Sequence, residues 1–396
     1  MNSQTGKPEP RRITILGSTG SVGESTVDII QRNLSAYKVL ALTANRNWEK
    51  LVQQAKYLSP QLVALADPAG YKKLSDALAG TDIRVVAGTE GLCEAASLDS
   101  DWVMAAIVGA AGLRPTLEAV KRGVVVALAN KECLVSAGTL FMNAVAAHGA
   151  TLLPVDSEHN AIFQVFDFKQ KNKIKKIILT ASGGPFLKWT ESDMGAVTPA
   201  QAVAHPNWSM GAKISVDSAT MMNKGLEVLE AHHLFGMPSE KIDIIVHPQS
   251  VVHSLVEYDD GSILAQLGSP DMRIPIAYTL GWPNRMSALS APLDLTALGS
   301  LQFEAPDPVR FPALRLARSA LQTGGAAPTI LNAANEVAVE RFLAGKSTFL
   351  DIASIVEKTL SRMPNQPPET LEDVMAVDAE ARRIAGEIKI FGEAAE

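Results

Sequence analysis

The spacing of hydrophobic positions changes twice along the chain. From residue 12, short runs of β-branched and other apolar residues alternate with longer segments in which apolar residues recur at helical spacing. Continuous apolar strands separated by helices are typical of a parallel sheet that is covered on both faces. The pattern therefore predicts an N-terminal α/β domain with a doubly wound parallel sheet over residues 12–155. Its predicted strands are 13–16, 39–43, 62–66, 84–86, 102–108, 124–127 and 151–155.

Beyond residue 155 the pattern indicates a second domain. Strands are predicted at 177–180, 242–246, 251–258 and 262–267, and Asp259-Asp260-Gly261 joins the last two as a hairpin. A lysine-rich stretch, 169–176, is most simply a solvated turn. These features predict a central α+β domain over residues 156–290, in which the long irregular segment of about 186–211 forms a mobile flap.

The last part of the chain is predicted to be helical. Proline is frequent from 282 to 312 without a clear period, which predicts an extended linker over residues 291–312. Apolar residues then recur at helical spacing, with Gly324, Gly345 and Pro364 as stops. This predicts a C-terminal helical bundle over residues 313–396. Its helices are expected at 313–323, 326–344, 351–363 and 371–388.

Composition excludes several classes of protein. With 47% hydrophobic and 20% charged residues the chain is expected to fold throughout, and its net charge of −6 argues against a nucleic-acid partner. The most apolar stretches are far shorter than the roughly 20 residues that span a bilayer, and residues 1–12 are predicted to be a frayed polar leader. Cys93 and Cys133 are interpreted as core thiols, which favours a reducing, cytoplasmic compartment.

A glycine-rich turn follows the first predicted strand directly. It reads Gly-Ser-Thr-Gly-Ser-Val-Gly from Gly17 to Gly23, and a helix is predicted from about Glu24. Glycines allow the backbone to turn tightly and to approach a pyrophosphate that lies on the N–H groups at the helix start, as in Rossmann-like domains. The spacing is G-x-x-G-x-x-G rather than G-x-G-x-x-G, so the turn alone is equally compatible with a purely structural role.

The end of the second predicted strand indicates which dinucleotide would bind. An NAD-dependent enzyme of this fold usually places an acidic residue there to accept a hydrogen bond from the ribose 2′-hydroxyl. This chain has Asn45, Arg46 and Asn47 instead. Arg46 offers a planar cation for a 2′-phosphate, although an ordinary surface arginine is the alternative. The segment favours NADPH over NADH.

Two carboxylates follow the strand predicted at 151–155. In the tetrapeptide Asp-Ser-Glu-His from Asp156 to His159, an extended backbone would direct Asp156 and Glu158 to the same side. Two carboxylates on one side repel each other unless a cation joins them, and all-oxygen ligation suits Mg²⁺ or Mn²⁺. A solvated acidic turn is the alternative interpretation.

A second polar cluster lies in a predicted helix. Ser218, Asn223 and Lys224 could hold a phosphate through charge-assisted hydrogen bonds. Glu227 lies about one turn from Asn223 and Lys224 and could supply a third carboxylate for a metal. A solvated helix face is the alternative, so the interpretation depends on the other fragments.

Six fragments together resemble the 1-deoxy-D-xylulose 5-phosphate reductoisomerase family, in order and in spacing, from about residue 12 to residue 388. They are Gly-Ser-Thr-Gly-Ser-Val-Gly at 17, Ala-Asn-Lys-Glu at 129, Asp-Ser-Glu-His at 156, Ser-Gly-Gly-Pro at 182, His-Pro-Asn-Trp at 205 and Asn-Lys-Gly-Leu-Glu at 223. The chain departs from the family pattern at Asn45, where glycine is frequent, and at Val22, where isoleucine is common.

The resemblance implies a reaction and its cofactors. Deoxyxylulose phosphate would be rearranged and reduced by NADPH to 2-C-methyl-D-erythritol 4-phosphate, with a divalent ion (Mg²⁺, Mn²⁺ or Co²⁺), in non-mevalonate isoprenoid precursor synthesis. It also implies a homodimer without nucleic-acid or membrane partners. The protein would be cytoplasmic and of bacterial type, or plastidic if a transit peptide has been removed.

The resemblance also implies roles for individual residues. Asp156, Glu158 and Glu227 would hold the metal and, with Lys131, form the catalytic set. The substrate would contact Lys131, Ser157, Glu158, Ser182, His205, Ser218, Asn223, Lys224 and Glu227. The cofactor would contact Thr19, Gly20, Ser21, Val22, Asn45, Arg46, Asn47, Asn130, Glu132 and Gly211. His159 and His253 fall near the site by resemblance but are not assigned a catalytic role.

Two rival functions remain from the sequence. One is a metal-free NADP-dependent dehydrogenase with the same doubly wound sheet, which the three carboxylates argue against. The other is a non-catalytic NADPH-sensing module, which the presence of Lys131, Lys224 and a flap argues against.

Overall fold

The computed structural model describes residues 9–208 and 210–389 and divides into two compact units. The first unit comprises the chain up to residue 130 together with 144–155 and 272–289, and the second comprises 131–143, 156–271 and the chain from 290 onward. Residues 1–8 of the predicted leader and 390–396 of the predicted C-terminal domain lie outside the described residues. Among those described, no helix is both long and apolar enough to cross a membrane.

The first unit is built on a seven-stranded sheet in which all neighbouring strands are parallel, in the order β4-β3-β2-β1-β5-β6-β7. The strands are β1 (Arg11–Leu16), β2 (Tyr37–Ala44), β3 (Leu62–Leu65), β4 (Arg84–Ala87), β5 (Trp102–Ala105), β6 (Val125–Leu128) and β7 (Thr151–Pro154). The predicted strand 102–108 is too long, because β5 pairs at Ala105 with Leu16 and Leu128, where its neighbours also end.

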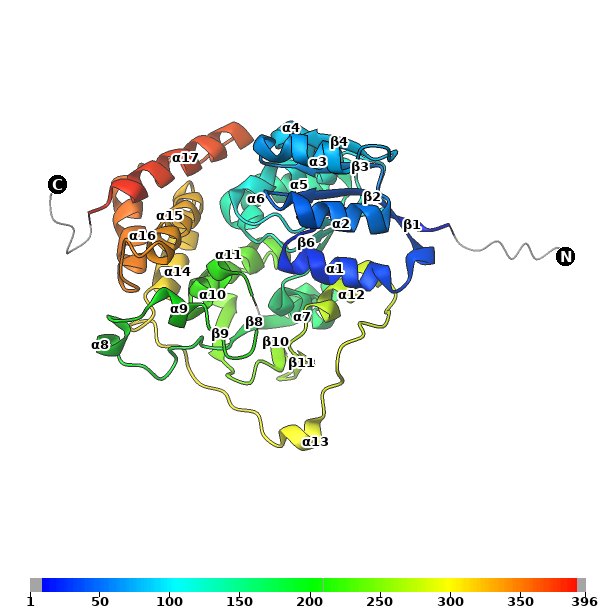
Figure 1. The fold of residues 1–396 in the computed structure, drawn as a ribbon. Coiled ribbons are helices and arrows are strands. Elements are labelled where there is room, and N and C mark those ends of the chain that lie inside the picture. Colours follow the sequence, from blue (N-terminus) through cyan, green and yellow to red (C-terminus); the bar gives the residue numbers. More distant parts are fainter. Residues whose placement is uncertain (1–8, 209, 390–396) are drawn as a thin grey trace. The chain divides into compact units, whose positions relative to one another are not determined.

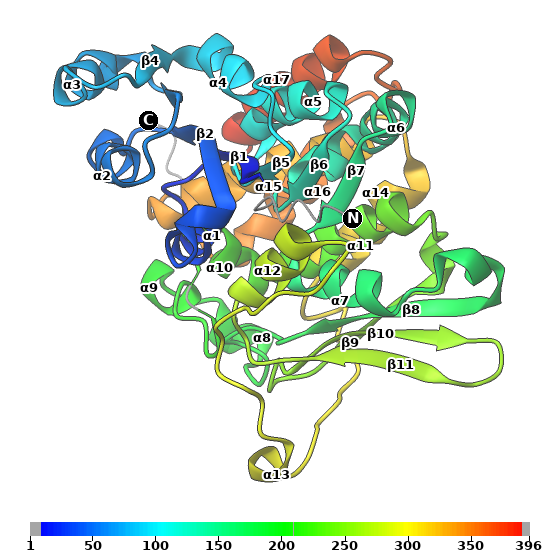
Figure 2. The same ribbon diagram turned by 90° about the vertical axis from the view of Figure 1, so that its right-hand side faces the viewer.

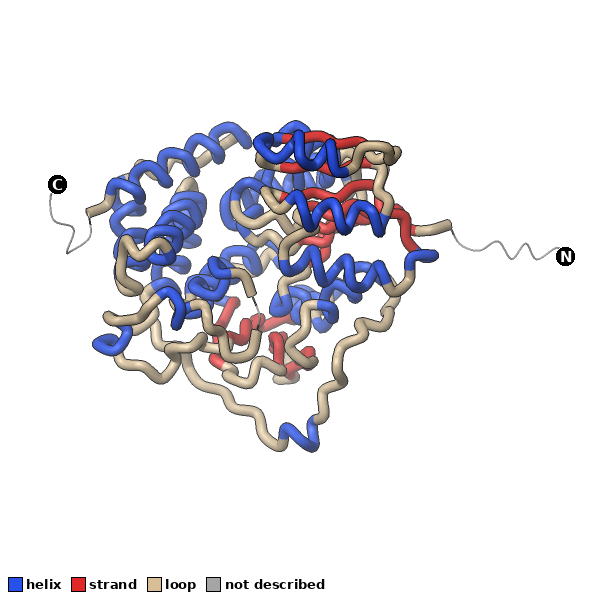
Figure 3. Tube along the Cα trace, in the orientation of Figure 1, coloured by secondary structure: helices blue, strands red, loops and turns tan. Residues whose placement is uncertain are grey.

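Helices lie on both faces of this sheet, as Figure 3 shows, and the predicted doubly wound fold is confirmed. They are α1 (Ser21–Gln31), α2 (Trp48–Leu58), α3 (Tyr71–Ala77), α4 (Gly88–Ala96), α5 (Leu113–Lys121) and α12 (Arg273–Gly281). Fully buried side chains such as Ile13, Leu42 and Trp102 form the core. The chain adds strands outward from β1 on one side and then returns to pair β5 on the other. Ligands of open α/β sheets bind at such a switch point.

The second unit contains a four-stranded sheet in the order β11-β10-β8-β9 (Figure 2). The strands are β8 (Ile174–Ala181), β9 (Ile242–Val246), β10 (Val252–Tyr258) and β11 (Ile263–Leu267). β10 and β11 form the predicted antiparallel hairpin, whereas β8 and β9 are parallel. β8 begins earlier than predicted, and Lys175 and Lys176 belong to the strand, where Glu257 and Asp243 on the flanking strands neutralise them at 2.6 Å.

Helices make up most of the rest of the second unit. They are α7 (Ser157–Val165), α8 (Glu191–Met194), α9 (Pro199–Ala202), α10 (Ala212–Ala219), α11 (Met222–Phe235), α13 (Leu295–Leu298), α14 (Ala313–Thr323), α15 (Ala327–Leu343), α16 (Asp351–Arg362) and α17 (Leu371–Glu387). The four predicted C-terminal helices are present, and α15, α16 and α17 pack together (Figure 1). One apolar core runs from β8 through α11 to α14 and α15, so the helices that support the site and the C-terminal helices are packed as one body. α6 (Glu132–His148) begins in this unit and ends in the first.

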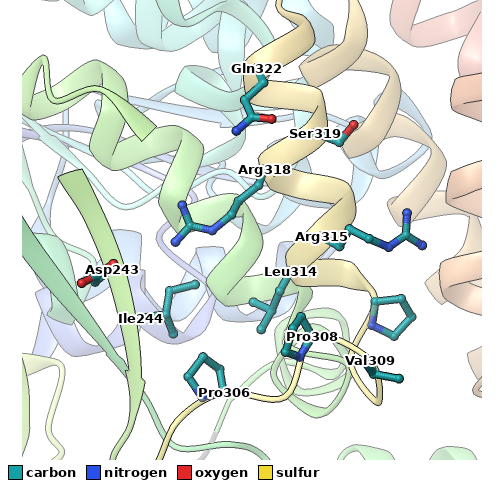
Figure 4. A pocket seen from close by; sticks show the side chains of 11 residues that line it. Asp243, Ile244, Pro306, Pro308, Val309, Leu314, Arg315, Arg318, Ser319 and Gln322 are labelled. Atoms are coloured by element: carbon teal, nitrogen blue, oxygen red, sulfur yellow. The ribbon is translucent and has the colours of Figure 1, made fainter. Parts of the chain in front are cut away.

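A groove of about 850 Å³ lies between β9, the linker and α14 (Figure 4). Three charged side chains line it, and each is engaged within the protein. Arg318 donates to the carbonyls of Ser239 and Ile242, Arg315 pairs with Glu357, and Asp243 pairs with Lys176. The Arg318 contacts tie α14 to the start of β9, the Arg315 pair joins α14 to α16, and the Asp243 pair joins β9 to β8, so these charged side chains have structural partners.

Candidate active site

Three carboxylates converge in the second unit. Asp156 stands just before α7 and accepts hydrogen bonds from the backbone N–H groups of Glu158 (3.1 Å) and His159 (3.4 Å), as a helix cap does. Glu158 lies in the first turn of α7, whereas Glu227 comes from α11 and is fully buried. One carboxylate oxygen from each of the three lies within 4.8 Å of the other two. The structure thus gathers the residues that the sequence suggested as metal ligands.

The route by which they meet differs from the expectation. The sequence predicts an extended backbone that directs Asp156 and Glu158 to the same side. In the structure β7 ends at Pro154 and a helix starts at Ser157, because the Asp156 carboxylate caps that helix. The two carboxylates therefore meet around a helix N-terminus rather than along a strand.

Two lysines lie among the carboxylates. The Nζ atom of Lys131 is 2.7 Å from Oδ2 of Asp156 and 3.1 Å from Oε1 of Glu227. The Nζ atom of Lys224 donates to Oε1 of Glu158 at 3.0 Å and also pairs with Glu227. Both lysines are buried, so removal of either would leave a carboxylate without its counter-charge in a poorly hydrated place.

The pKa shifts follow from this arrangement. Burial alone would lower the pKa of Lys131, but Asp156 and Glu227 outweigh it and hold that pKa well above its usual value. Glu158 and Glu227 likewise raise the pKa of Lys224 against the effect of burial. Burial and the nearby charge of Glu227 raise the pKa of Glu158. Positive charge is therefore stabilised at the centre of the carboxylate cluster.

A histidine and a further carboxylate lie next to the cluster, and the histidine contacts both. His159 is fully buried, and its Nε2 atom lies 3.0 Å from the backbone oxygen of Glu227. Its Nδ1 atom is 3.0 Å from Glu230 and 3.4 Å from Asp156. Burial would lower the pKa of His159, but Glu230 and Asp156 outweigh it and raise that pKa. Sequence reasoning missed Glu230, although its spacing of three residues from Glu227 on a helix was the available signal.

The donor set fits a hard divalent cation. Asp156, Glu158 and Glu227 supply oxygen ligands only, which is the preference of Mg²⁺ and Mn²⁺. The ammonium groups of the two lysines lie among these carboxylates, where positive charge is favourable. The three carboxylate residues would therefore hold the ion.

A second polar group surrounds the loop after β8. Oγ of Ser182 lies 2.9 Å from Nε2 of His205. Because Nδ1 of His205 accepts the backbone N–H groups of Asn207 and Trp208, its Nε2 atom carries the proton and donates to Ser182. Burial lowers the pKa of His205, which favours this neutral form.

Gly184 brings this loop against the end of α10. Its φ is +68°, and a Cβ atom there would lie only 2.7 Å from the backbone oxygen of Ser218. A side chain at Gly184 would therefore force the two segments apart. Ser182 and His205 bond to each other and the backbone of Ser218 packs against Gly184, whereas Asn223 bonds to Lys131 and Glu227 and lies with the carboxylates.

The predicted flap is pinned at both ends. Trp189 packs against Phe186 at 4.9 Å between ring centroids, and Arg310 of the linker donates to the carbonyls of Leu187 and Trp189. Trp189 thus packs at the base of the segment. Near the other end, Asn207 donates to the carbonyl of Pro248 at 2.6 Å, and the ring of Trp208 lies 6.1 Å from that of His253. Ser209 lies outside the described residues.

In the first unit the glycine-rich turn lies between β1 and α1. Gly17 has a φ of +84°, and a Cβ atom there would lie 2.6 Å from the backbone oxygen of Ala106. A Cβ atom at Gly23 would clash with the backbone at Gly17 and Ser18. Gly20 precedes α1 and provides no side-chain cap, so the first N–H groups of α1 are positioned to receive an anion. Thr19 and Gly20 lie on this turn, and Ser21 and Val22 are the first two residues of α1.

Arg46 lies beyond the end of β2, between Asn45 and Asn47. Its side chain is 82% exposed and pairs with Asp67 at 3.0 Å. Asn47 caps α2 by accepting the N–H of Lys50, and Asn45 is exposed. The Arg46 guanidinium is therefore held by one exposed ion pair, which is weak, so it can readily exchange Asp67 for a phosphate.

The remaining predicted cofactor residues lie in both units. Asn130 is buried in the first unit, where it donates to the carbonyl of Gly109 at 3.0 Å. Glu132 and Gly211 belong to the second unit, where Glu132 pairs with Lys213 at 2.7 Å and Gly211 precedes α10. Sequence reasoning gave no role to Lys213.

The parallel sheet with its glycine turn, and the carboxylate and lysine cluster, place the chain in the class of dinucleotide-dependent α/β enzymes. Family models described as 1-deoxy-D-xylulose 5-phosphate reductoisomerase match residues 13–138, and models of C-terminal domains of the same enzyme match residues 152–235 and 267–384. The chain belongs to the 1-deoxy-D-xylulose 5-phosphate reductoisomerase family.

Relatives and solved structures agree along nearly the whole chain. The reductoisomerase of Rhodospirillum centenum is 61% identical over 388 residues, covering 98% of this chain and 96% of the relative. That of Zymomonas mobilis is 58% identical over 374 residues, covering 94% and 96%. A structure of the Zymomonas mobilis enzyme in complex with NADPH superimposes with a TM-score of 0.90 at 56% identity, covering 95% of this chain and 98% of that one.

A second solved structure carries the metal as well. It is a DOX-P reductoisomerase in complex with NADPH, fosmidomycin and magnesium, with a TM-score of 0.90 at 46% identity, and it covers 95% of this chain and 97% of its own. The expected family and fold are thereby confirmed.

Proposed function

We propose that this chain converts 1-deoxy-D-xylulose 5-phosphate to 2-C-methyl-D-erythritol 4-phosphate with NADPH and a divalent metal ion, in isoprenoid precursor synthesis. The observation that carries the proposal is the meeting of Asp156, Glu158 and Glu227 within 4.8 Å, in a chain that belongs to this family. The bound ion would polarise substrate oxygens, and NADPH would supply the hydride.

The residues of the chain supply positioning and charge. Lys131 and Lys224 keep their protons because of the surrounding carboxylates, so both donate hydrogen bonds and stabilise negative charge that develops on substrate oxygens. Asn223 is fixed by Lys131 and Glu227 and presents its amide beside them. Ser157 donates to Glu158 at 2.5 Å and orients that carboxylate.

The phosphate would be held by Ser182, His205, Ser218 and the adjoining part of α11. Ser182 and His205 are bonded to each other, and Gly184, two residues after Ser182, packs against the backbone of Ser218. A phosphate held there would fix one end of the substrate while the other end meets the carboxylates. Closure of segment 186–211 would exclude water from the reaction.

The cofactor would lie on the glycine turn. Thr19, Gly20, Ser21 and Val22 would cradle the pyrophosphate at the start of α1, and Arg46 with Asn45 and Asn47 would take the 2′-phosphate. Asn130, Glu132 and Gly211 complete the proposed cofactor set.

Product identification tests the proposed function against direct reduction by a metal-free dehydrogenase. The purified protein is incubated with deoxyxylulose phosphate, NADPH and Mg²⁺, and the product is examined by proton NMR. Methylerythritol phosphate carries its methyl group on a carbon without hydrogen and gives a singlet. Direct reduction of the ketone would leave the methyl group next to a CHOH carbon and give a doublet, which would refute the proposal.

A homodimer in the cytoplasm is also proposed. β11 is an edge strand whose Ile263 and Leu264 are 52% and 47% exposed, and exposed apolar edge strands favour pairing with another chain. Sedimentation should give twice the chain mass, and Leu264→Lys should shift it toward the monomer. A reducing compartment suits the two cysteines, of which Cys133 is buried and Cys93 partly exposed.

A further inference from the structure

Lys213 connects two segments that carry proposed active-site residues. It lies in the first turn of α10, two residues after Gly211, and its Nζ atom is 2.7 Å from Glu132 and 2.9 Å from Asp217. Glu132 and Asp217 are 6% and 1% exposed. Burial would lower the pKa of Lys213, but Asp217, Glu132 and Glu336 outweigh it and raise that pKa far above its usual value. The ammonium is therefore a permanent charge between two buried carboxylates.

Each of these carboxylates adjoins a residue of the site in sequence. Glu132 follows Lys131, the lysine that contacts Asp156 and Glu227. Asp217 precedes Ser218, whose backbone oxygen packs against Gly184. A displacement of either carboxylate would move the adjoining backbone, so Lys213 fixes the start of α6 relative to the end of α10.

A C-terminal helix holds the same group from the other side. Asn335 of α15 is fully buried and donates from Nδ2 to Oδ1 of Asp217 at 2.8 Å. The next residue, Glu336, pairs with Arg382 of α17. α15 thus contacts the Lys213 group through one buried hydrogen bond, and a partly buried ion pair links α17 to the next residue of α15.

We infer that Lys213, Asp217 and Asn335 are positioning residues of the reaction, which hold Lys131 and Ser218 in register for the two ends of the substrate. The inference rests on the proposed function, because it assigns those two residues to substrate. It gives α15 and α17 a role beyond covering the core. Buried charges cost free energy when unpaired, so the network has one stable arrangement and tolerates little displacement.

Asn335→Ala tests the inference, and Asn332→Ala is its matched control. Asn332 is also fully buried on α15, one turn away, but it donates to Glu336 and Ser136 rather than to Asp217. We expect Asn335→Ala to worsen kcat/KM for the sugar phosphate roughly tenfold, since small displacements at a reacting centre are costly. Asn332→Ala should leave kcat/KM for the sugar phosphate within about twofold of the unmodified protein.

A substitution at Lys213 gives a second comparison. Lys213→Met should lose activity on the sugar phosphate, and Lys213→Arg should restore most of it by keeping the charge. If Lys213→Met fails to fold, the variant with Glu132→Gln, Lys213→Met and Asp217→Asn together removes the unpaired charges and should fold but remain slow. Equal losses in Asn335→Ala and Asn332→Ala, or wild-type kinetics in the triple variant, would overturn the inference.

Amide hydrogen exchange separates this inference from the proposed function. Asn335→Ala should speed exchange in the peptide that covers 214–220, and Asn332→Ala, which does not contact Asp217, should speed it less there. Unchanged exchange in this peptide in Asn335→Ala would refute the inference even in a protein without reductoisomerase activity. Inactivity of the unmodified chain would instead refute the proposed function.

Discussion

The ammonium of Lys131 lies 2.7 Å from the carboxylate of Asp156, with both side chains at most one-tenth exposed. Lys131 comes at the start of α6 and Asp156 just before α7, so the pair joins two loops that follow neighbouring strands of one parallel sheet. The positive charge of Lys131 offsets part of the negative charge of the buried carboxylate cluster and so stabilises it. The same carboxylates would bind a divalent cation.

Replacement of one proposed metal ligand should separate metal binding from cofactor binding. Glu227→Gln keeps the shape of the side chain but removes a buried negative charge that contacts both lysines. We expect Mn²⁺ affinity, followed by electron paramagnetic resonance, to fall roughly tenfold or more, with NADPH affinity unchanged. Glu340→Gln on the exposed face of α15 is the control. Unaltered Mn²⁺ binding in Glu227→Gln would exclude Glu227 as a ligand.

Arg46 should set the preference for NADPH. In Arg46→Ala the exposed cation beyond β2 is gone, so KM for NADPH should rise by roughly tenfold or more while KM for NADH changes little. Steady-state kinetics with both cofactors measure this. Arg32→Ala, which removes an exposed arginine from the end of α1, should change neither. An equal rise for both cofactors in Arg46→Ala would contradict the assignment.

Two glycines with similar backbone angles allow contact and strain to be separated. Gly184 has a φ of +68° and Gly149 a φ of +64°, but of the described atoms none lies within 4 Å of a Cβ atom at Gly149. Both alanine variants should lose about 1 kcal/mol from backbone strain. Gly184→Ala should lose more, and should also raise KM for the sugar phosphate, because its Cβ atom would push Ser218. Equal unfolding midpoints for both variants would show that the close approach is unimportant.

His233 should make stability sensitive to acid. Burial, with a smaller effect of His232, lowers the pKa of His233 to about 4. His233 becomes protonated near pH 6.5 in the unfolded chain but only near pH 4 in the folded chain. Its contribution to the free energy of unfolding is therefore complete above pH 6.5 and is lost as the pH falls toward 4. Denaturant unfolding from pH 7 to pH 4 measures this: the difference in unfolding free energy between the wild type and His233→Gln should shrink by roughly 1–3 kcal/mol. Parallel curves would show that His233 is not the responsible group.

Most of the fold could be predicted, because local pattern decides it. The seven strands of the first sheet and the four C-terminal helices follow from apolar runs and helical spacing that agree with the structure. The boundaries that failed depend on neighbours. β5 ends at Ala105 because its partner strands end, and Lys176 joins β8 because Asp243 on β9 neutralises it.

The sequence motifs identify the residues of the candidate site, but they do not predict its geometry. Asp156 acts as a helix cap, which an expected extended backbone concealed. Glu230 and Lys213 were missed because a carboxylate or a lysine on a helix is usually solvated, and only tertiary packing shows that these two are paired with His159 and Asp217. The individual residue roles and the domain boundaries stay predictions.

The most direct test of the metal-dependent reductoisomerase account follows NADPH absorbance after addition of deoxyxylulose phosphate, first with EDTA and then with Mg²⁺ or Mn²⁺ restored. The account predicts substrate-dependent oxidation that stops with EDTA and returns with the metal. Oxidation that continues in EDTA, or no oxidation with any metal, would contradict it.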